Sequence, residues 1–332
     1  MVITDVVRRR LDSLTKPPGS LGRLESLLIR YAEVRNAEPP PSPRMLAVIC
    51  CGDHGVTAEG VSAWPSEVTR EMMRNFVRGG AAISVLCRNL AIDTWVVDAG
   101  AKGEPVEGVR DCRVAAGTQN MAIAPAMSVD DARTALAHGR KLAEEASAAG
   151  YDFLLTGDMG IGNTTSATAL LCAYADIAPQ DVTGPGAGLD AAGVSRKAQV
   201  ISRALTLHSS RDPLEIAANL GGFEIVMLAG LLMGAAQRRL PVLFDGFITC
   251  SAALIAQALE PSSMSAAFFS HRSAEPGHRA MLAKLGATPV LDLEMRLGEG
   301  TGAALAASLF QSACKLYHEM ATFEQAAVQG KL

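Results

Sequence analysis

The chain has 332 residues, of which 49% are hydrophobic and 19% are charged, and its formal net charge at pH 7 is −4. This composition is typical of a globular protein with enough apolar side chains for a large core. No block of basic residues occurs, so nucleic acid is not expected as a partner. The longest apolar run, residues 225–236, is too short for a membrane span, which needs about 20 residues, so no membrane partner is expected either.

The N-terminus and the cysteines indicate the compartment. Residues 1–16 carry several charges and contain no apolar segment typical of a secretion signal. The seven cysteines lie mostly in apolar runs, and none are spaced as Cys-x-x-Cys. Such cysteines are typical of buried thiols in a reducing compartment and not of a disulfide framework or a zinc site. We therefore expect a cytoplasmic protein without a metal ion.

The first part of the chain favours helices followed by a buried strand. Helices are predicted over residues 3–14 and 20–37, separated by Pro17-Pro18-Gly19, and Ser20 is expected to cap the second helix. The proline-rich segment 39–43 is typical of a stiff linker. A continuous apolar run over residues 45–51 then predicts a strand that is buried on both faces.

The order of strand, glycine-containing turn and helix recurs along the rest of the chain. Further strands are predicted over 94–97, 153–156, 241–244 and 266–269. Helices are predicted from about 65 to 89, from about 163 onward, and over 129–148, 191–208, 222–238, 248–259 and 302–322. This alternation favours an α/β fold with an open parallel sheet flanked by helices, a Rossmann-like three-layer arrangement.

The two ends of the chain predict a second, smaller unit. Residues 1–40 and 302–332 contain predicted helices, and neither segment contains a predicted strand. We expect these two segments to form a small helical domain, with the C-terminal helix joining the N-terminal ones, beside a large α/β domain over 44–300.

Polar residues follow the predicted strands at the point where each strand ends. They are Asp53, Asp98, Asp158, Asp245 and His271. Because ligands of open parallel sheets bind beyond the carboxyl ends of the strands, we expect the functional site at this edge.

Residues 296–303, Arg-Leu-Gly-Glu-Gly-Thr-Gly-Ala, place Glu299 between two glycines directly before the last apolar helix. Three glycines in five residues indicate positive φ angles or a close approach of the main chain to another group. A carboxylate held on such a turn can take a proton from a bound substrate. A charged loop residue at a helix N-terminus would give the same pattern.

A second glycine-rich turn lies at residues 157–165. Three glycines and Asp158 come before Asn163-Thr164-Thr165, which opens a helix. Such a turn leaves backbone N–H groups directed outward, as in a cradle for an anion such as phosphate. An ordinary threonine-capped helix would explain Thr164 but not the three glycines and the acid.

Three further segments contain residues that could take part in chemistry. Residues 184–188 resemble a dinucleotide-binding fingerprint only weakly, because a proline lies inside the motif and no buried strand leads into it. No nicotinamide cofactor is therefore expected, although this turn could bind a phosphate or sugar with Lys197 as counter-charge. Asp53-His54 could form an acid–base pair but lacks further ligands at metal-site spacing. Trp64 could stack on a planar ring or simply cover a helix start.

Taken together, these segments resemble the nicotinate-nucleotide–dimethylbenzimidazole phosphoribosyltransferases, which make the lower ligand of cobalamin. The resemblance is carried by residues 14–22, 52–56, 79–82, 157–165, 220–224, 245–247 and 297–303, in chain order. It implies transfer of the phosphoribosyl group of nicotinate mononucleotide to 5,6-dimethylbenzimidazole. The products would be α-ribazole 5′-phosphate and nicotinate, with Glu299 as general base and inversion at C1′.

The resemblance also implies how the site is assembled. The Asn-Thr-Thr segment and the 184–188 turn would hold the phosphate and ribose, and the segment from Ser62 to Met72 would form the wall of the benzimidazole pocket. The substrate-binding residues we expect are Asp158, Met159, Gly160, Gly162, Asn163, Thr164, Gly186, Lys197, Ser62, Trp64, Met72, Leu297 and Gly298. Members of this family are homodimers with sites near the subunit interface, so a homodimer acting on small molecules is expected.

Two departures from the family pattern leave alternatives open. Asp158 stands where many members carry glutamate, and Trp64 and Glu71 lie where tyrosine and glutamine are frequent. Transfer to a different aromatic base is therefore an alternative, as is a non-catalytic member that binds the nucleotide or the base. A nucleoside phosphorylase would share the phosphate cradle but would not need Glu299.

Overall fold

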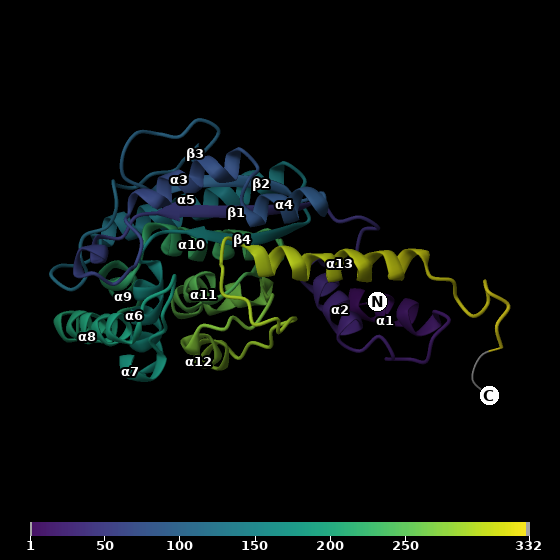
Figure 1. Cartoon of the computed structure of the whole chain (residues 1–332). Helices are drawn as coiled ribbons and strands as arrows, with labels where there is room; N and C mark the ends of the chain where they lie inside the picture. Colours follow the sequence, from purple (N-terminus) through teal and green to yellow (C-terminus); the bar gives the residue numbers. More distant parts are fainter. Residues whose placement is uncertain (1, 330–332) are drawn as a thin grey trace.

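The computed structural model describes residues 2–329, and within this range the chain forms a parallel sheet of six strands (Figure 1). The strand order is β3-β2-β1-β4-β5-β6, and every neighbouring pair is parallel. The strands are β1 (Met45–Gly52), β2 (Asp93–Gly100), β3 (Arg110–Asp111), β4 (Phe153–Met159), β5 (Val242–Phe244) and β6 (Ala267–Phe269). This confirms the predicted open parallel α/β fold.

Helices cover both faces of the sheet. One hydrophobic cluster joins one face to α5 (Val129–Ala148), α6 (Asn163–Ala175), α7 (Pro179–Val182), α8 (Ala191–Leu207), α9 (Pro213–Leu220), α10 (Phe223–Gln237), α11 (Phe247–Leu259) and α12 (Pro276–Leu285). A second cluster joins the other face to α3 (Glu67–Val77), α4 (Ala82–Asn89) and the first half of α13 (Thr301–Glu319). Side chains of β1 alternate between the two clusters, as expected for a strand buried on both faces.

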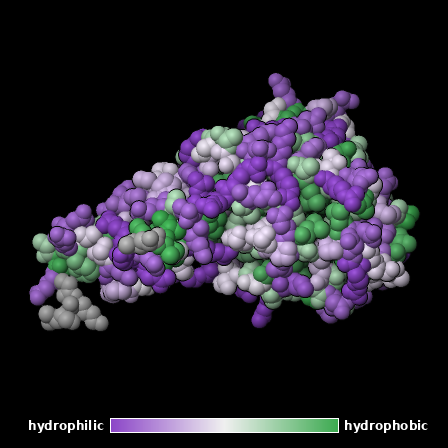
Figure 2. All heavy atoms as spheres, turned by 180° about the vertical axis from the view of Figure 1, so that it is seen from behind, coloured by the Kyte–Doolittle hydropathy of each residue, from purple (hydrophilic) through white to green (hydrophobic). Residues whose placement is uncertain are grey.

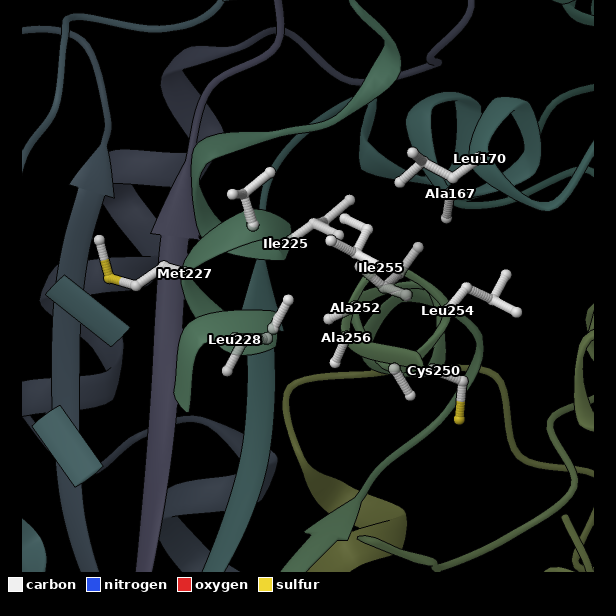
Figure 3. Close-up of a cluster of buried hydrophobic side chains, with 14 of the residues drawn as sticks. Ala167, Leu170, Ile225, Met227, Leu228, Cys250, Ala252, Leu254, Ile255 and Ala256 are labelled. Carbon is white, nitrogen blue, oxygen red and sulfur yellow. The ribbon is translucent and has the colours of Figure 1, made fainter. Parts of the chain in front are cut away.

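Helix α10 lies at the centre of the first cluster. Every residue from Phe223 to Ala235 is buried, and the helix packs against α5 and α11. Figure 3 shows Ile225 and Leu228 of α10 facing Ile255 and Ala256 of α11. A helix that is apolar all round belongs in a core, as the run 225–236 predicts. This packing fixes the first turn of α10, where Glu224 lies against Gly52 at the carboxyl end of β1.

The helices at the two ends of the chain pack together. A third cluster contains side chains of α1 (Ile3–Ser13), α2 (Arg23–Arg35) and the second half of α13. Figure 1 shows these helices side by side at one end of the molecule, away from α6 to α9. A buried ion pair, Lys16 Nζ to Glu25 Oε1 at 2.8 Å, closes the loop between α1 and α2. Residues 1 and 330–332, which the predicted helical domain includes, lie outside the described residues.

Several local predictions were wrong. The helix expected from about 65 to 89 is two helices, because the chain turns at Gly79, which has φ +79°. Helix α2 begins at Arg23 with Gly22 as N-cap, so Ser20 does not cap it. The short strand β3 and the helices α7, α9 and α12 were not predicted.

The surface fits the composition of the chain. Figure 2 shows mostly hydrophilic side chains on the face seen from behind, with smaller hydrophobic patches between them. Among residues 2–329, none of the helices combines the length and the apolar character needed to cross a bilayer.

Candidate active site

The expected site lies at the carboxyl edge of the sheet, near the point where the strand order reverses. Strands β1 and β4 are neighbours, and the chain extends outward from them in opposite directions. A crevice at the carboxyl ends of such strands is the usual ligand site of a doubly wound sheet. Asp158 lies at the end of β4, His54 follows β1, and Asp245 follows β5. The predicted gathering of polar residues at this edge is therefore present.

Glu299 lies on the expected turn directly before α13. Its φ is +63°, between Gly298 at +82° and Gly300 at +97°, so three successive residues are left-handed. Its side chain is buried, at 8% exposure, and Oε2 has no hydrogen-bond partner. A Cβ atom at Gly157 would overlap the Glu299 carbonyl, so the end of β4 lies directly against this turn.

Three buried carboxyl groups meet beside this turn. Burial raises the pKa of Glu299, against a backbone hydrogen bond from Ile83 that lowers it. Burial, followed by the charge of Asp245, raises the pKa of Asp158 well above its usual range. Burial also raises the pKa of Asp245 to about 7. The cluster therefore favours accepting protons, as a general base requires.

A chain of contacts connects the carboxyl cluster to the glycine-rich turns. Asp158 Oδ2 accepts a hydrogen bond from Asn163 Nδ2 at 2.9 Å. The hydroxyl oxygen of the next residue, Thr164, accepts a hydrogen bond from Lys197 Nζ at 2.7 Å. Arg296 then donates to the carbonyl of Gly186 at 3.1 Å, which ties the Glu299 segment to the 184–188 turn. Four segments that are distant in sequence thus form one continuous wall.

Lys197 is the buried cation of this wall. Its ammonium group is buried and donates to Thr164 and to the carbonyl of Gly184 at 3.3 Å. Burial lowers the pKa of Lys197 to about 8, against the nearby charge of Glu275. Glu275 itself is buried, and burial raises its pKa despite Lys197 and Arg296. Glu275 and Arg296 were not among the predicted site residues.

The first turn of α6 differs in part from the predicted anion cradle. The N–H groups of Asn163 and Thr165 donate to the carbonyls of Gly160 and Gly162, both at 3.0 Å, and Ile161 donates to Thr69 Oγ1 at 3.1 Å. These three N–H groups are thus occupied within the protein. An anion here would depend more on Lys197 and on hydroxyl groups than the sequence indicated.

The Ser62 segment lies against the same wall. A cavity of about 50 Å³ is lined by Ser62, by residues 160–164 and by parts of the 185–189 turn. Trp64 Nε1 donates to the carbonyl of Ala187 at 3.0 Å, while 54% of the side chain remains exposed. The indole therefore has a fixed edge and an open face, which suits contact with a planar ligand.

Three predicted residues have looser connections to this wall. Met72 and Met159 are half-buried and both pack against the second hydrophobic cluster. Leu297 is largely exposed, although Gly298 beside it lies next to the carboxylate of Asp158.

A buried pair of His54 and Glu224 lies beneath the site. His54 Nε2 and Glu224 Oε1 are 2.7 Å apart, and both side chains are fully enclosed. Burial lowers the pKa of His54, but Glu224 outweighs this effect, so the pKa is raised overall. Gly160 lies directly on this pair, since a Cβ atom there would be 3.2 Å from His54 Nε2. The sequence offered Asp53 as the partner of His54, but Asp53 instead accepts from the Lys102 N–H at 2.7 Å.

His271, which follows β6 at the carboxyl edge of the sheet, contacts Ser270 and Gly302. Its Nδ1 lies 3.1 Å from Ser270 Oγ, and its ring packs against Gly302 of α13. Across residues 2–329, no three His, Cys, Asp or Glu side chains are grouped so that they could hold a metal ion.

Known proteins resemble this chain over nearly its whole length. Residues 2–328 match a family model described as phosphoribosyltransferase. A nicotinate-nucleotide–dimethylbenzimidazole phosphoribosyltransferase of Solidesulfovibrio magneticus is 51% identical over 330 residues, 97% of this chain and 93% of the relative. A Pseudomonas aeruginosa protein of the same name is 50% identical over 326 residues, with the same two coverages. A crystal structure of the enzyme of that name from Thermus thermophilus has a TM-score of 0.91 at 43% identity and covers 99% of both chains.

Proposed function

This chain belongs to the phosphoribosyltransferase family that it matches from residue 2 to residue 328, and from that premise we propose a specific reaction for it. The enzyme transfers the phosphoribosyl group of nicotinate mononucleotide to 5,6-dimethylbenzimidazole. Its products are α-ribazole 5′-phosphate, a precursor of the cobalamin lower ligand, and nicotinate. Relatives with half of their residues identical carry the names of these two substrates, which supports the proposal.

Glu299 is the general base in this proposal, and its geometry is the observation that carries it. A buried carboxylate with a free oxygen on a left-handed turn is costly to keep for stability alone. The raised pKa makes the carboxylate a better proton acceptor near neutral pH. A positioned base of this kind typically accelerates a reaction by about 10²–10⁴-fold.

The bond changes balance without a metal or a redox cofactor. One ring nitrogen of the benzimidazole attacks C1′ of the ribose, while the bond from C1′ to the nicotinate nitrogen breaks. The leaving pyridinium takes that electron pair and becomes neutral nicotinate nitrogen. The second ring nitrogen of the acceptor loses its proton to Glu299. Attack from the face opposite to the leaving group converts the β-configuration into α.

The nucleotide is proposed to lie along the wall from Asp158 to Lys197. Lys197 and the Thr164 hydroxyl would bind the phosphate, because they form the buried cationic end of this wall. Asp158, which accepts a hydrogen bond from Asn163, would lie nearer the ribose. Gly160, Gly162, Asn163 and Gly186 would complete this half of the site.

The acceptor base is proposed to lie on the Ser62 side, against the open face of Trp64. Met72, Met159, Leu297 and Gly298 would then enclose its apolar methyl edge. Because Trp64 and Glu71 differ from the residues frequent in the family, a related aromatic base is the alternative acceptor.

We further propose that the enzyme acts as a homodimer in the cytoplasm, with the two end segments forming a small helical domain. The free state of all seven cysteines, six of them buried, is consistent with a reducing compartment.

A product assay tests the reaction. The pure protein would be incubated with nicotinate mononucleotide and, in turn, with dimethylbenzimidazole, benzimidazole or adenine, and the products identified by mass spectrometry. A Glu299→Gln variant keeps the size of the side chain but cannot accept the proton. We expect a riboside phosphate and free nicotinate, formed about 10²–10⁴-fold more slowly by the variant.

The outcomes separate the alternatives. Preferential transfer to benzimidazole or adenine would identify a different acceptor. Turnover unaffected by Glu299→Gln would contradict the assigned base. Nucleotide binding without transfer to any base would leave a non-catalytic binding protein, and phosphate-dependent release of nicotinate would indicate a phosphorylase.

A further inference from the structure

Helix α13, which begins directly after Glu299, has no side-chain cap from its own N-cap residue. The N-cap of α13 is Gly300, which has no side chain to satisfy the first N–H groups of the helix. Free N–H groups at a buried helix start are unfavourable, and they attract a negative charge. Glu299 cannot take this role, since its Oε2 is unpartnered and its residue comes before the cap.

Asp245, which directly follows β5, supplies the missing acceptor. Its Oδ1 accepts from Ala303 N–H at 2.9 Å, and its Oδ2 accepts from Gly300 N–H at 3.2 Å. The two oxygens of one carboxylate therefore hold the first turn of α13, 55 residues further along the chain at Gly300.

The backbone of Asp245 is itself fixed from both sides. Its N–H donates to Thr156 Oγ1 of β4 at 3.1 Å, and its carbonyl accepts from Ser270 Oγ after β6 at 2.6 Å. His271 adds a steric stop, because its ring packs directly on Gly302. Contacts at the ends of three neighbouring strands, β4, β5 and β6, thus hold the start of α13 in place.

From this geometry we propose that Asp245 is a positioning residue, which holds the left-handed turn of Glu299 in the orientation needed for proton transfer. The inference rests on the proposed function of Glu299. The side chain of Asp245 has no exposed surface, so it acts through the turn and not on the substrate. Without it, the Gly298–Gly300 segment can relax toward ordinary φ values, and the carboxylate of Glu299 moves with it.

The test compares Asp245→Asn and Asp245→Ala with Glu299→Gln. Asparagine keeps one acceptor oxygen and alanine keeps none, so the loss should be graded. A misplacement of about 1 Å costs on the order of 10²-fold in rate, and we expect this loss in kcat for alanine and about tenfold for asparagine. The KM for nicotinate mononucleotide should change by no more than about twofold, because no hydrogen bond of Asp245 goes to Lys197 or Thr164, which are proposed to bind the phosphate.

A double variant provides the decisive readout. If Asp245 acts through Glu299, then Asp245→Asn combined with Glu299→Gln should be no slower than Glu299→Gln alone. Losses that multiply would overturn the proposal. Asp212→Ala is the matched control, since Asp212 caps α9 through the N–H groups of Leu214 and Glu215. An equal loss of kcat in this control would also overturn it, because general destabilisation would then explain the effect.

Hydrogen exchange separates this proposal from the proposed reaction. In Asp245→Asn, the amides of residues 300–303 should exchange faster than in the unaltered protein, whatever the activity. If the unaltered protein transfers no phosphoribosyl group, the proposed function fails, and this exchange alone decides whether Asp245 holds the turn. Unchanged exchange at these amides would refute the positioning role.

Discussion

Lys197 offers a direct test of where the nucleotide phosphate lies. Its buried ammonium group is the cation at the end of the site wall and donates to Thr164 Oγ1 at 2.7 Å. Replacement by methionine keeps the length and the apolar stem but removes the charge. We expect KM for nicotinate mononucleotide to rise while kcat changes little, because the phosphate is bound equally in the ground state and the transition state.

The magnitude follows from the type of contact and from the pKa. A hydrogen bond to a charged group contributes about 1.5–3 kcal/mol, and about 1.4 kcal/mol is tenfold, so KM should rise about 10- to 150-fold. Burial lowers the pKa of Lys197 to about 8, so the unaltered enzyme loses this cation as the pH rises through that value. KM should therefore increase about tenfold per pH unit at higher pH, whereas the variant should show no such rise.

The assay is a set of initial rates against nicotinate mononucleotide between about pH 6.5 and pH 9.5, a range that brackets the Lys197 pKa of about 8. The second ionisation of a phosphate lies near pH 6, so the nucleotide keeps its charge over nearly all of this range. Lys141→Met, which alters an exposed lysine of α5, is the control. A KM that stays constant with pH, or that shifts less than about twofold in Lys197→Met, would show that the phosphate binds elsewhere.

Three further predictions address other parts of the site. Glu299 must be ionised to accept a proton, and burial raises its pKa. We therefore expect kcat to fall as the pH drops, with a midpoint above the pKa of an ordinary glutamate. A kcat that does not fall at low pH would contradict the role of Glu299 as the base. Removing one partner of the His54–Glu224 pair, as in Glu224→Gln, should cost about 3–5 kcal/mol in urea unfolding; a loss below about 1 kcal/mol would mean that the pair is not buried as described. The pKa of His54 is higher in the folded protein than in the unfolded chain, where it is about 6.5. The pair therefore contributes its full stability below about pH 6.5, and this contribution is lost as the pH rises through the pKa of His54 in the folded protein. Trp64→Ala should raise KM for the acceptor base about 2- to 13-fold, from about 0.5–1.5 kcal/mol of aromatic contact, and an equal change in KM for the nucleotide would place the indole at the other substrate.

The sequence anticipated those features that depend on a few neighbouring residues. The apolar run of β1 and the helix over 129–148 were predicted closely, because burial on both faces and helical periodicity are written in consecutive side chains. The turn at Glu299 was predicted for the same reason, since three closely spaced glycines indicate left-handed backbone wherever the chain goes afterwards. The break at Gly79 was missed, although its signal is also local.

The site as a whole required the tertiary structure. His54 and Glu224 are 170 residues apart, and Asp245 is 55 residues from Gly300. The sequence placed a polar residue after each strand, but it could not say which strands are neighbours. Without knowing that the strands follow the order β1-β4-β5-β6, we could not distinguish Asp245 from the other acids after strands, and we paired His54 with Asp53 instead of Glu224.

What the sequence determined by itself was therefore the fold class, the edge at which polar groups gather and the turn on which Glu299 lies. Only the tertiary structure decided which groups on that edge meet, which carboxylates are buried together and which N–H groups of the 160–165 turn are already occupied. The physical reason is the distance along the chain over which each effect acts. Backbone preference and hydrophobic periodicity act within a few residues, whereas desolvation, pKa shifts and long-range hydrogen bonds arise only when strands and helices are packed.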